Sequence, residues 1–198
     1  MPLAKNPLIQ ATALLALVLI ATTARPQEAA GEFVWAPNFP VGATIPVLEA
    51  PDQHGEIQTL ATLTGSKGLM LVFNRSFDWC PYCKAQLTGL QGAVENFRAA
   101  GFNVATITYD PVATLAMVAE DEGITFALLH DDAIKHVNAF NILNTDMAPD
   151  SFGYGIPQPG IMLISPAGEI LAKFFEENYR VRPDWSDVVN LARSLQKR

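Results

Sequence analysis

The sequence predicts an α/β protein in which one mixed β-sheet carries helices on both faces. Three observations lead to this fold class. Apolar runs of strand length alternate with amphipathic segments of helical length through the middle of the chain. A later apolar segment with a Pro-Ala-Gly turn predicts a β-hairpin, and an amphipathic helix follows it. The 198 residues, 49% of them hydrophobic, are enough for one domain with a sizeable core.

The N-terminal segment has the form of a secretory signal peptide. Lys5 gives it a positive start, Leu14–Ile20 is a strongly apolar run too short for a membrane span, and small residues end at Ala24. The alternative is an uncleaved anchor, because residues 6–24 are just long enough to cross a bilayer. We therefore predict a signal peptide or anchor at residues 1–24. The domain is expected to be exported, periplasmic or secreted, with membrane attachment only if the segment stays uncleaved.

Residues 25–42 are rich in proline and lack periodicity, so we interpret them as a linker, and residues 43–198 as the folded domain. The domain is expected to open with a short hairpin that turns at Gln53-His54-Gly55. Residues 68–74 form a continuous apolar run, which is typical of a buried central strand.

The rest of the domain alternates between helices and strands. An amphipathic helix is expected from Pro81 to about Ala100, and a strand at residues 102–110 follows it. Asp110 is the expected N-cap of the next helix, with Pro111 in its first turn. The later elements are a strand at residues 125–131, a helix at 132–142, a loop at 143–159, a hairpin at 160–175 and a helix at 184–196.

The formal net charge of −7 excludes two classes of partner. Nucleic acids and anionic membranes are bound by clustered lysine and arginine, and no segment of the chain holds such a cluster. The chain has only two cysteines, which are too few for a disulfide scaffold. The two cysteines are therefore better interpreted as redox or catalytic residues than as a structural framework.

Cys80 and Cys83 lie where the central strand ends and the following helix begins. A helix N-terminus has unpaired N–H groups and partial positive charge, which would lower the pKa of Cys80. Pro81 suits the first helical position, where an N–H is not needed. Cys83 lies one turn later on the same face, so it could resolve a mixed disulfide that Cys80 forms with a substrate. The pattern favours a reversible dithiol.

Three other interpretations of the cysteine pair are weaker. A structural disulfide across two residues would close a very small loop and stabilise little. A zinc site would need further ligands, and His54, His130 and His136 lack metal-ligand spacing. Inert packing would not explain the Trp-Cys-Pro-x-Cys setting in an exported chain. We expect neither a metal nor a cofactor.

Four segments together resemble a known family. "LVFNRSFDWCPYCKAQLTGLQ" resembles the active-site strand and helix of thioredoxin-fold proteins. "APDQHGEIQTL", "TYDPVATLAMVAEDEGITFALLHDD" and "PGIMLISPAGEI" resemble the N-terminal hairpin, the strand–helix–strand unit and the later hairpin of the alkyl hydroperoxide reductase and thiol-specific antioxidant (AhpC/TSA) family. The match covers roughly residues 43–168. It implies a peroxiredoxin-like protein with a thioredoxin-like fold and an N-terminal hairpin extension.

The resemblance implies roles for the residues around the cysteines. Cys80 would be the nucleophile and Cys83 the resolving thiol. Trp79, Pro81 and Tyr82 would support the site, Trp79 either as an apolar platform or as a rim residue that packs on the domain edge.

The loop before the later hairpin would supply a further site residue. Pro159 would be the cis-proline of the thioredoxin fold, whose neighbouring backbone can pair with a substrate chain, and Pro157 is an alternative placement. Phe152 and Tyr154 either line a substrate groove or pack on the domain.

The chain departs from the family at positions that matter for peroxide. Peroxiredoxins carry a proline seven residues before the reactive cysteine and Thr or Ser three before it, and here Phe73 and Phe77 occupy those places. The peroxide-binding arginine has no clear counterpart, although Arg75 is close in sequence. Thioredoxins bury an acid six residues before the first cysteine, where this chain has Asn74 facing Thr106.

We predict an exported thiol–disulfide oxidoreductase that uses a Cys-Pro-Tyr-Cys dithiol. Its partners would be protein or small-molecule disulfides or thiols and an external reductant. Two alternatives stay open: a thiol-dependent peroxidase that uses the same cysteines, and a redox-inactive binding module whose cysteines form a vestigial disulfide.

Overall fold

The computed structural model describes residues 34–195. The predicted signal peptide or anchor and the first part of the predicted linker lie outside the described residues, as do the last three residues of the chain. None of the helices in the described range is long and apolar enough to cross a membrane.

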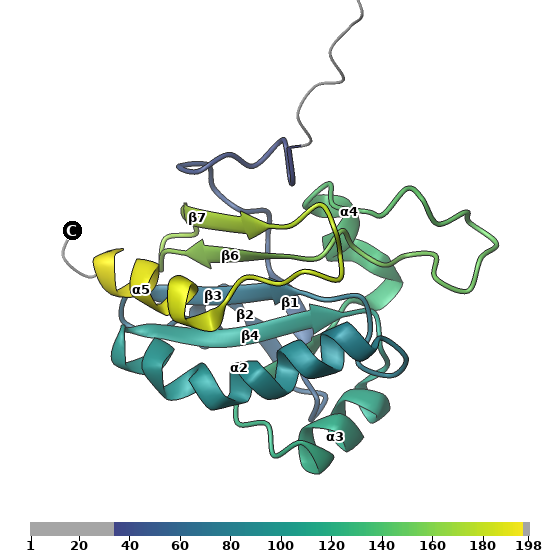
Figure 1. Cartoon of the computed structure of the whole chain (residues 1–198), viewed down its shortest axis with the longest axis horizontal. Coiled ribbons are helices and arrows are strands. Elements are labelled where there is room, and N and C mark those ends of the chain that lie inside the picture. Colours follow the sequence, from purple (N-terminus) through teal and green to yellow (C-terminus); the bar gives the residue numbers. More distant parts are fainter. Residues whose placement is uncertain (1–33, 196–198) are drawn as a thin grey trace, which may run out of the picture. The chain divides into compact units, whose positions relative to one another are not determined.

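A five-stranded mixed sheet forms the centre of the domain, with strand order β5-β4-β3-β6-β7. Three parallel strands come first in sequence: β3 (Gly68–Phe73), β4 (Phe102–Thr108) and β5 (Ala127–His130). The later hairpin of β6 (Gly160–Ile164) and β7 (Ile170–Phe175) adds two strands, β6 running antiparallel to β3 (Figure 1). The predicted mixed sheet is confirmed, and so is the prediction that the apolar run at residues 68–74 contains its buried central strand.

A two-stranded antiparallel hairpin precedes the sheet, as predicted. It consists of β1 (Glu49–Pro51) and β2 (Ile57–Thr59). Its turn places Gly55 at a φ of +79°, where a side chain would be strained. The hairpin leads into α1 (Leu60–Leu63), capped by the Thr59 hydroxyl. Sequence periodicity missed α1, because four residues are too few to show a helical pattern.

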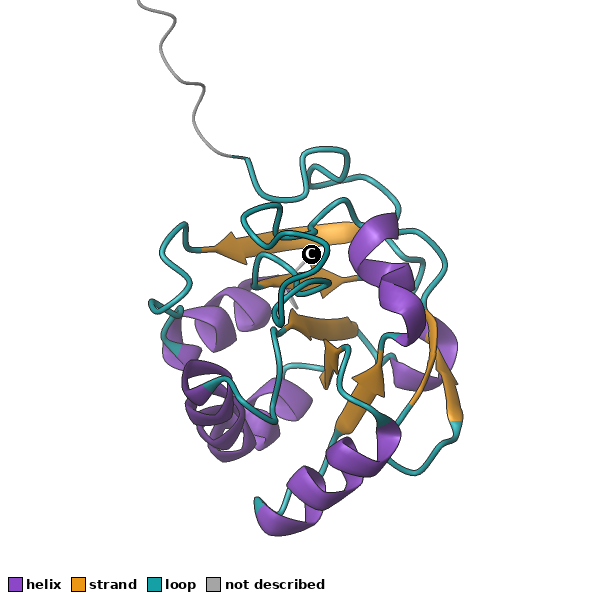
Figure 2. Ribbon diagram, turned by 90° about the vertical axis from the view of Figure 1, so that its right-hand side faces the viewer, coloured by secondary structure: helices purple, strands orange, loops and turns teal. Residues whose placement is uncertain are grey.

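Helices cover both faces of the sheet (Figure 2). Side chains of α2 (Pro81–Ala99), α3 (Val112–Asp121) and α5 (Trp185–Leu195) pack into the apolar cluster on one face. The other face is covered by α1 and by α4 (Lys135–Ala139), which follows a 3₁₀ turn at Asp132–Ile134. The predicted layer arrangement is therefore confirmed.

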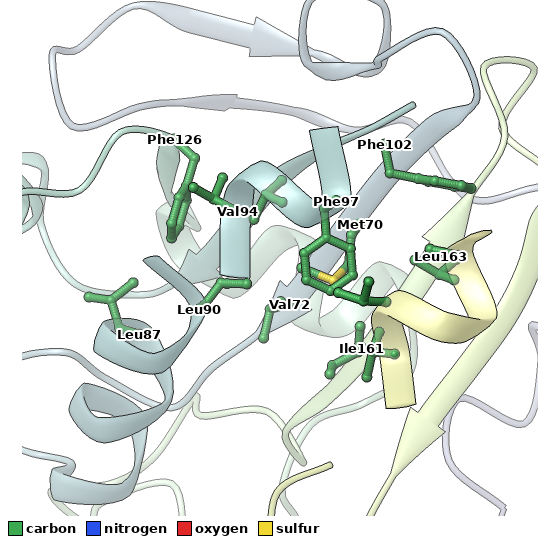
Figure 3. Packing of buried hydrophobic residues seen from close by; sticks show 14 of the residues in the cluster. Met70, Val72, Leu87, Leu90, Val94, Phe97, Phe102, Phe126, Ile161 and Leu163 are labelled. Carbon is green, nitrogen blue, oxygen red and sulfur yellow. The ribbon is translucent and has the colours of Figure 1, made fainter. Parts of the chain in front are cut away.

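The predicted apolar stripe of α2 lies in the core against β3. Figure 3 shows this packing, in which Met70 and Val72 of the strand share one cluster with the helix residues. The buried helix residues of the stripe are Leu87, Leu90, Val94 and Phe97. Close packing on this scale fixes where α2 begins, and so fixes the position of the two cysteines at its start.

Trp35, from the predicted linker, belongs to the core of the opposite face. Its ring meets Phe73 edge-on with centroids 5.9 Å apart and stacks on Phe175 at 6.1 Å. Its indole N–H donates to the Gln158 carbonyl at 2.9 Å. The part of the linker that the structure describes therefore contributes to the folded unit, and it meets the end of β3 that leads to the cysteines.

Candidate active site

The two cysteines lie at the N-terminus of α2, directly after the carboxyl end of the central strand β3. Cys80 is the N-cap, and its sulfur accepts a hydrogen bond from the Cys83 backbone N–H at 3.3 Å. Pro81 occupies the start of the helix, as predicted. Both cysteines are free thiols in the structure, and their exposed fractions are only 1% and 0%.

Asp110 holds the loop that leads to the cysteines. Its carboxyl group accepts hydrogen bonds from the Ser76 hydroxyl at 2.7 Å and from the Phe77 backbone N–H at 2.5 Å. The Ser76 oxygen in turn accepts the backbone N–H groups of Asp78, at 3.0 Å, and Trp79, at 3.3 Å. One buried acid from the end of β4 therefore organises the loop between β3 and α2.

The prediction that Asp110 caps α3 is wrong. The N-cap is Pro111, and no side chain caps that helix. The Asp110 carboxyl turns the other way and also accepts the Thr108 hydroxyl at 2.9 Å. Because β3 and β4 are neighbouring parallel strands, their ends meet at one edge of the sheet, and the loop after β3 offers Asp110 more donors than α3 does.

The two thiols share a proton unequally. The pKa of Cys83 is lowered to about 6, chiefly because its sulfur accepts a hydrogen bond from the Cys80 thiol. The backbone N–H groups of Ser76 and Arg75 and the charge of Arg182 act in the same direction, while burial opposes them. The pKa of Cys80 is raised, because its thiol is the donor in that pair and because it is buried.

This direction reverses the prediction from the helix N-terminus. The sequence argument for a lowered Cys80 pKa considered only the N–H groups at the start of α2. One of these, the Cys83 N–H, does donate to the Cys80 sulfur at 3.3 Å, but the hydrogen bond that the Cys80 thiol donates to Cys83 and its burial outweigh it. The loop before the helix supplies additional N–H groups, and these favour the thiolate at Cys83. Once Cys83 is ionised, its negative charge opposes loss of the second proton from Cys80.

The reduced protein should therefore react with iodoacetamide first at Cys83, with a rate that follows a pKa of about 6 rather than the ordinary 9.0. Below this pKa the thiolate fraction, and with it the rate, should fall about tenfold per pH unit, and above it the rate should level off. Alkylation rates between pH 4.5 and 9, with the site read by mass spectrometry, test this. First labelling at Cys80, or a midpoint near 9, would contradict it.

Aromatic side chains surround the buried dithiol. The Trp79 indole N–H donates to the Tyr109 hydroxyl at 2.9 Å, and its ring lies 5.5 Å from that of Phe152, which is 80% exposed. Tyr82, the residue between Pro81 and Cys83, meets Tyr179 edge-on at 5.9 Å. The predicted substrate roles of Trp79 and Tyr82 stay predictions, but the structure brings both to the rim of the site.

Two arginines approach the dithiol from different parts of the chain. Arg75 is turned inward, with its guanidinium carbon 4.3 Å from the Tyr179 ring centre and 5.1 Å from that of Trp79. Arg182 lies in the segment between β7 and α5 and donates to the Gln86 side chain at 2.9 Å. Sequence reasoning missed Arg182, because it lies in an irregular, proline-flanked segment where no periodicity points to a site.

The prediction of a cis-proline is wrong. Every peptide bond in the described part of the chain is trans, including those before Pro157 and Pro159. The Gln158 N–H donates to the Ile142 carbonyl at 2.7 Å, and the Gln158 carbonyl accepts the Trp35 indole N–H. Both backbone groups before Pro159 are therefore used within the domain and are not free to pair with a substrate chain.

The two positions named for a thioredoxin-like proton carrier hold buried, uncharged polar side chains. Asn74 and Thr106 are buried, and the Asn74 Oδ1 and Thr106 Oγ1 atoms have no hydrogen-bond partner. Neither side chain is a carboxyl group, so neither can act as the proton carrier of thioredoxins.

Comparisons with known proteins point to one family. The family model described as "AhpC/TSA family" matches residues 41–173. Among curated proteins, the Escherichia coli peroxiredoxin Bcp is 31% identical over 101 residues, which is 51% of this chain and 64% of that relative. The chain thus spans just under two thirds of the length of this relative. A Pyrococcus abyssi peroxiredoxin is 22% identical over 162 residues, covering 79% of this chain and 71% of that one.

Solved structures show the same fold. The peroxidoxin BcpB of Mycobacterium tuberculosis aligns with a TM-score of 0.65 at 20% identity, over 80% of this chain and 97% of that one. A Xylella fastidiosa PrxQ variant aligns with a TM-score of 0.66 at 17% identity, over 79% and 96%. The predicted thioredoxin-like α/β fold is confirmed by these alignments.

Proposed function

The chain belongs to the AhpC/TSA family, and from this premise we propose that it is a thiol-dependent peroxidase with Cys80 and Cys83 as its redox pair. The observation that carries the proposal is the coupled pair of thiols at the start of α2, one with a lowered pKa and the other holding the proton. A dithiol peroxidase uses such a pair, because a thiolate attacks the peroxide and a second thiol then closes the disulfide.

The proposed reaction has two steps. The Cys83 thiolate attacks one oxygen of the hydroperoxide, the O–O bond breaks, and the leaving oxygen takes a proton to become an alcohol or water. Cys83 is then a sulfenic acid. The Cys80 sulfur displaces its hydroxyl as water and forms the disulfide. An external thiol or dithiol supplies the two electrons that restore the reduced pair.

Burial favours a small oxidant. Both sulfur-bearing residues are almost fully buried, beneath the rim that Trp79 and Tyr82 help to form. A hydroperoxide needs only a narrow path to Cys83, whereas a disulfide within a folded protein would need the rim to open. This difference supports peroxide over a protein disulfide as the first electron acceptor.

A protein thiol–disulfide oxidoreductase is the second candidate, and the environment of Cys80 favours it. Phe77 has no hydroxyl group, and the Ser76 hydroxyl is donated to Asp110, so neither offers a free hydroxyl to a peroxide. The exposed Phe152 beside Trp79 would suit contact with a polypeptide. Export of the domain remains a prediction from the sequence under either function.

One experiment separates the two candidates. The reduced protein should consume one equivalent of hydrogen peroxide and form the Cys80–Cys83 disulfide faster than it reduces an equal concentration of a disulfide-bonded protein. We expect the peroxide step to be slower than in dedicated peroxidases, because the two phenylalanines replace the usual proline and hydroxyl. Stopped-flow thiol loss measures both reactions, and the double variant Cys80→Ser/Cys83→Ser is the control.

Faster turnover with the protein disulfide would replace the peroxidase by the second candidate. Loss of thiols in neither reaction would favour the redox-inactive binding module.

A further inference from the structure

We propose that Arg75 and Arg182 form a carboxylate-binding subsite beside the dithiol, so that the protein prefers co-substrates carrying a carboxylate near the reacting oxygen or sulfur. The proposal rests on the proposed redox function of the cysteines for its biological meaning. The subsite itself can be tested on the reduced protein without any peroxide.

The buried Arg75 guanidinium uses only part of its hydrogen-bonding capacity, although it also interacts with the Tyr179 side chain. It is only 8% exposed, and its Nε–H has no hydrogen-bond partner. Its guanidinium faces the rings of Trp79 and Tyr179, which leaves the edge of the guanidinium plane to receive an acceptor. Leaving a buried charged donor unpaired is unfavourable, so an anion that paired with it would be favoured.

Arg182 presents a second unpaired nitrogen in a fixed orientation. Its Nε donates to Gln86 on α2, and its Nη1 donates to the carbonyls of Tyr179 and Val181. Its Nη2 is buried and has no partner. Three bonds therefore hold the guanidinium in place while one N–H group stays available, which is the preorganisation that a binding site requires.

The two arginines share one neighbour, Tyr179. Tyr179 contacts both, because its ring lies over Arg75 and its carbonyl accepts from Arg182. Each also acts on a cysteine: the charge of Arg75 favours the thiolate of Cys80, and that of Arg182 favours the thiolate of Cys83. Neither arginine forms an ion pair with a carboxylate among residues 34–195.

A carboxylate is the ligand that fits this arrangement. Guanidinium N–H groups match carboxylate oxygens in geometry, and charge-assisted hydrogen bonds of this kind are about twice as strong as neutral ones. The chain as a whole has a net charge of −7, so binding of an anion depends on local positive charge such as that of these two guanidinium groups. A carboxylate-bearing hydroperoxide and a carboxylate-bearing thiol share this chemistry, and the test below distinguishes them.

The test compares iodoacetate with iodoacetamide on the reduced protein. In both reactions the cysteine thiolate attacks the CH₂ group and iodide leaves, and the two reagents differ only in a carboxylate against an amide. The ratio of their rates cancels the thiolate fraction, so a change in cysteine pKa does not affect it. We expect the ratio at Cys83 to be about tenfold higher in the folded protein than in urea, equivalent to about 1.4 kcal/mol.

The variants Arg75→Gln and Arg182→Gln should each bring the ratio most of the way to its value in urea. Arg180→Gln is the matched control, since Arg180 lies on the same segment and against the same Tyr179 ring but is on the surface. An equal loss in Arg180→Gln would show a diffuse surface charge and overturn the subsite. An unchanged ratio in both site variants would also overturn the subsite. So would labelling of the native protein that occurs only through global unfolding.

Two further arms identify the source of the carboxylate. The oxidised protein is reduced with 3-mercaptopropionate or with 2-mercaptoethanol at equal thiolate concentration. The reduced protein is oxidised with a carboxylate-bearing or a neutral alkyl hydroperoxide. If the protein prefers the anionic thiol and Arg182→Gln removes that preference, the subsite serves the reductant. If it prefers the anionic hydroperoxide and Arg182→Gln removes that preference, the subsite serves the peroxide. A preference in neither arm would contradict a role in co-substrate choice, even if the peroxidase itself were active.

Discussion

Cys83→Ser should abolish the reaction with peroxide, whereas Cys80→Ser should retain a single oxidation that stops at a sulfenic acid. Cys83 is the thiol with the lowered pKa, because it accepts from the Cys80 thiol and from the N–H groups of Ser76 and Arg75. Removing it removes the attacking thiolate. Removing Cys80 leaves the thiolate, although its pKa should rise because it loses its strongest donor.

The measurement is one-equivalent peroxide consumption followed by trapping with dimedone and mass spectrometry. We expect a dimedone adduct on Cys83 in the Cys80→Ser variant and no peroxide-dependent adduct in the Cys83→Ser variant. In addition, the pH–rate profile of Cys80→Ser should be displaced upward from the midpoint of about 6 in the parent. An adduct on Cys80 in Cys83→Ser, with no reaction in Cys80→Ser, would restore the roles expected from the family resemblance.

The positions of the two cysteines in the fold could be predicted from the sequence, whereas the distribution of the proton between them could not. The position of Cys80 and Pro81 at the start of α2 follows from local signals, namely an apolar strand, a proline and an amphipathic helix. The sheet and its later hairpin were also predictable from local signals, namely the apolar runs and the Pro-Ala-Gly turn. The proton distribution depends on Arg75 and Ser76, which come from the preceding loop, and on Arg182, about a hundred residues later. Long-range contacts of this kind leave no periodic trace in one sequence.

The failures at Asp110 and Pro159 have the same origin. An Asp-Pro pair before a helical segment is a sound local capping signal, but three donors from β4 and the loop after β3 compete for the carboxyl group. A proline before the later hairpin matches the family pattern, yet the backbone beside it is already bonded to Ile142 and Trp35. Trp35 itself could not be assigned to the core, because its partners lie on distant strands.

Asp110→Ala should lower the free energy of unfolding by about 3 kcal/mol. The substitution removes the acceptor of the Ser76 hydroxyl, the Phe77 N–H and the Thr108 hydroxyl, all in a buried environment, and each unpaired buried group costs about 1–3 kcal/mol before relaxation. Urea unfolding of the reduced protein measures the loss. Asp132→Ala is the matched control, because that side chain is 87% exposed and lies at the end of the neighbouring strand, and it should change stability by less than about 0.5 kcal/mol.

The same variant should also change the chemistry at temperatures where it is fully folded. Asp110 touches neither cysteine, so it acts as a positioning residue through Ser76, whose oxygen holds the N–H groups of Asp78 and Trp79 just before Cys80. When the loop relaxes, the N–H groups that favour the Cys83 thiolate should no longer be aimed at its sulfur, and the midpoint of the alkylation profile should rise from about 6 toward 9.0. A purely structural role would lower stability and leave that midpoint in place. An unchanged midpoint in folded Asp110→Ala would therefore show that the loop does not control the reactivity of the dithiol.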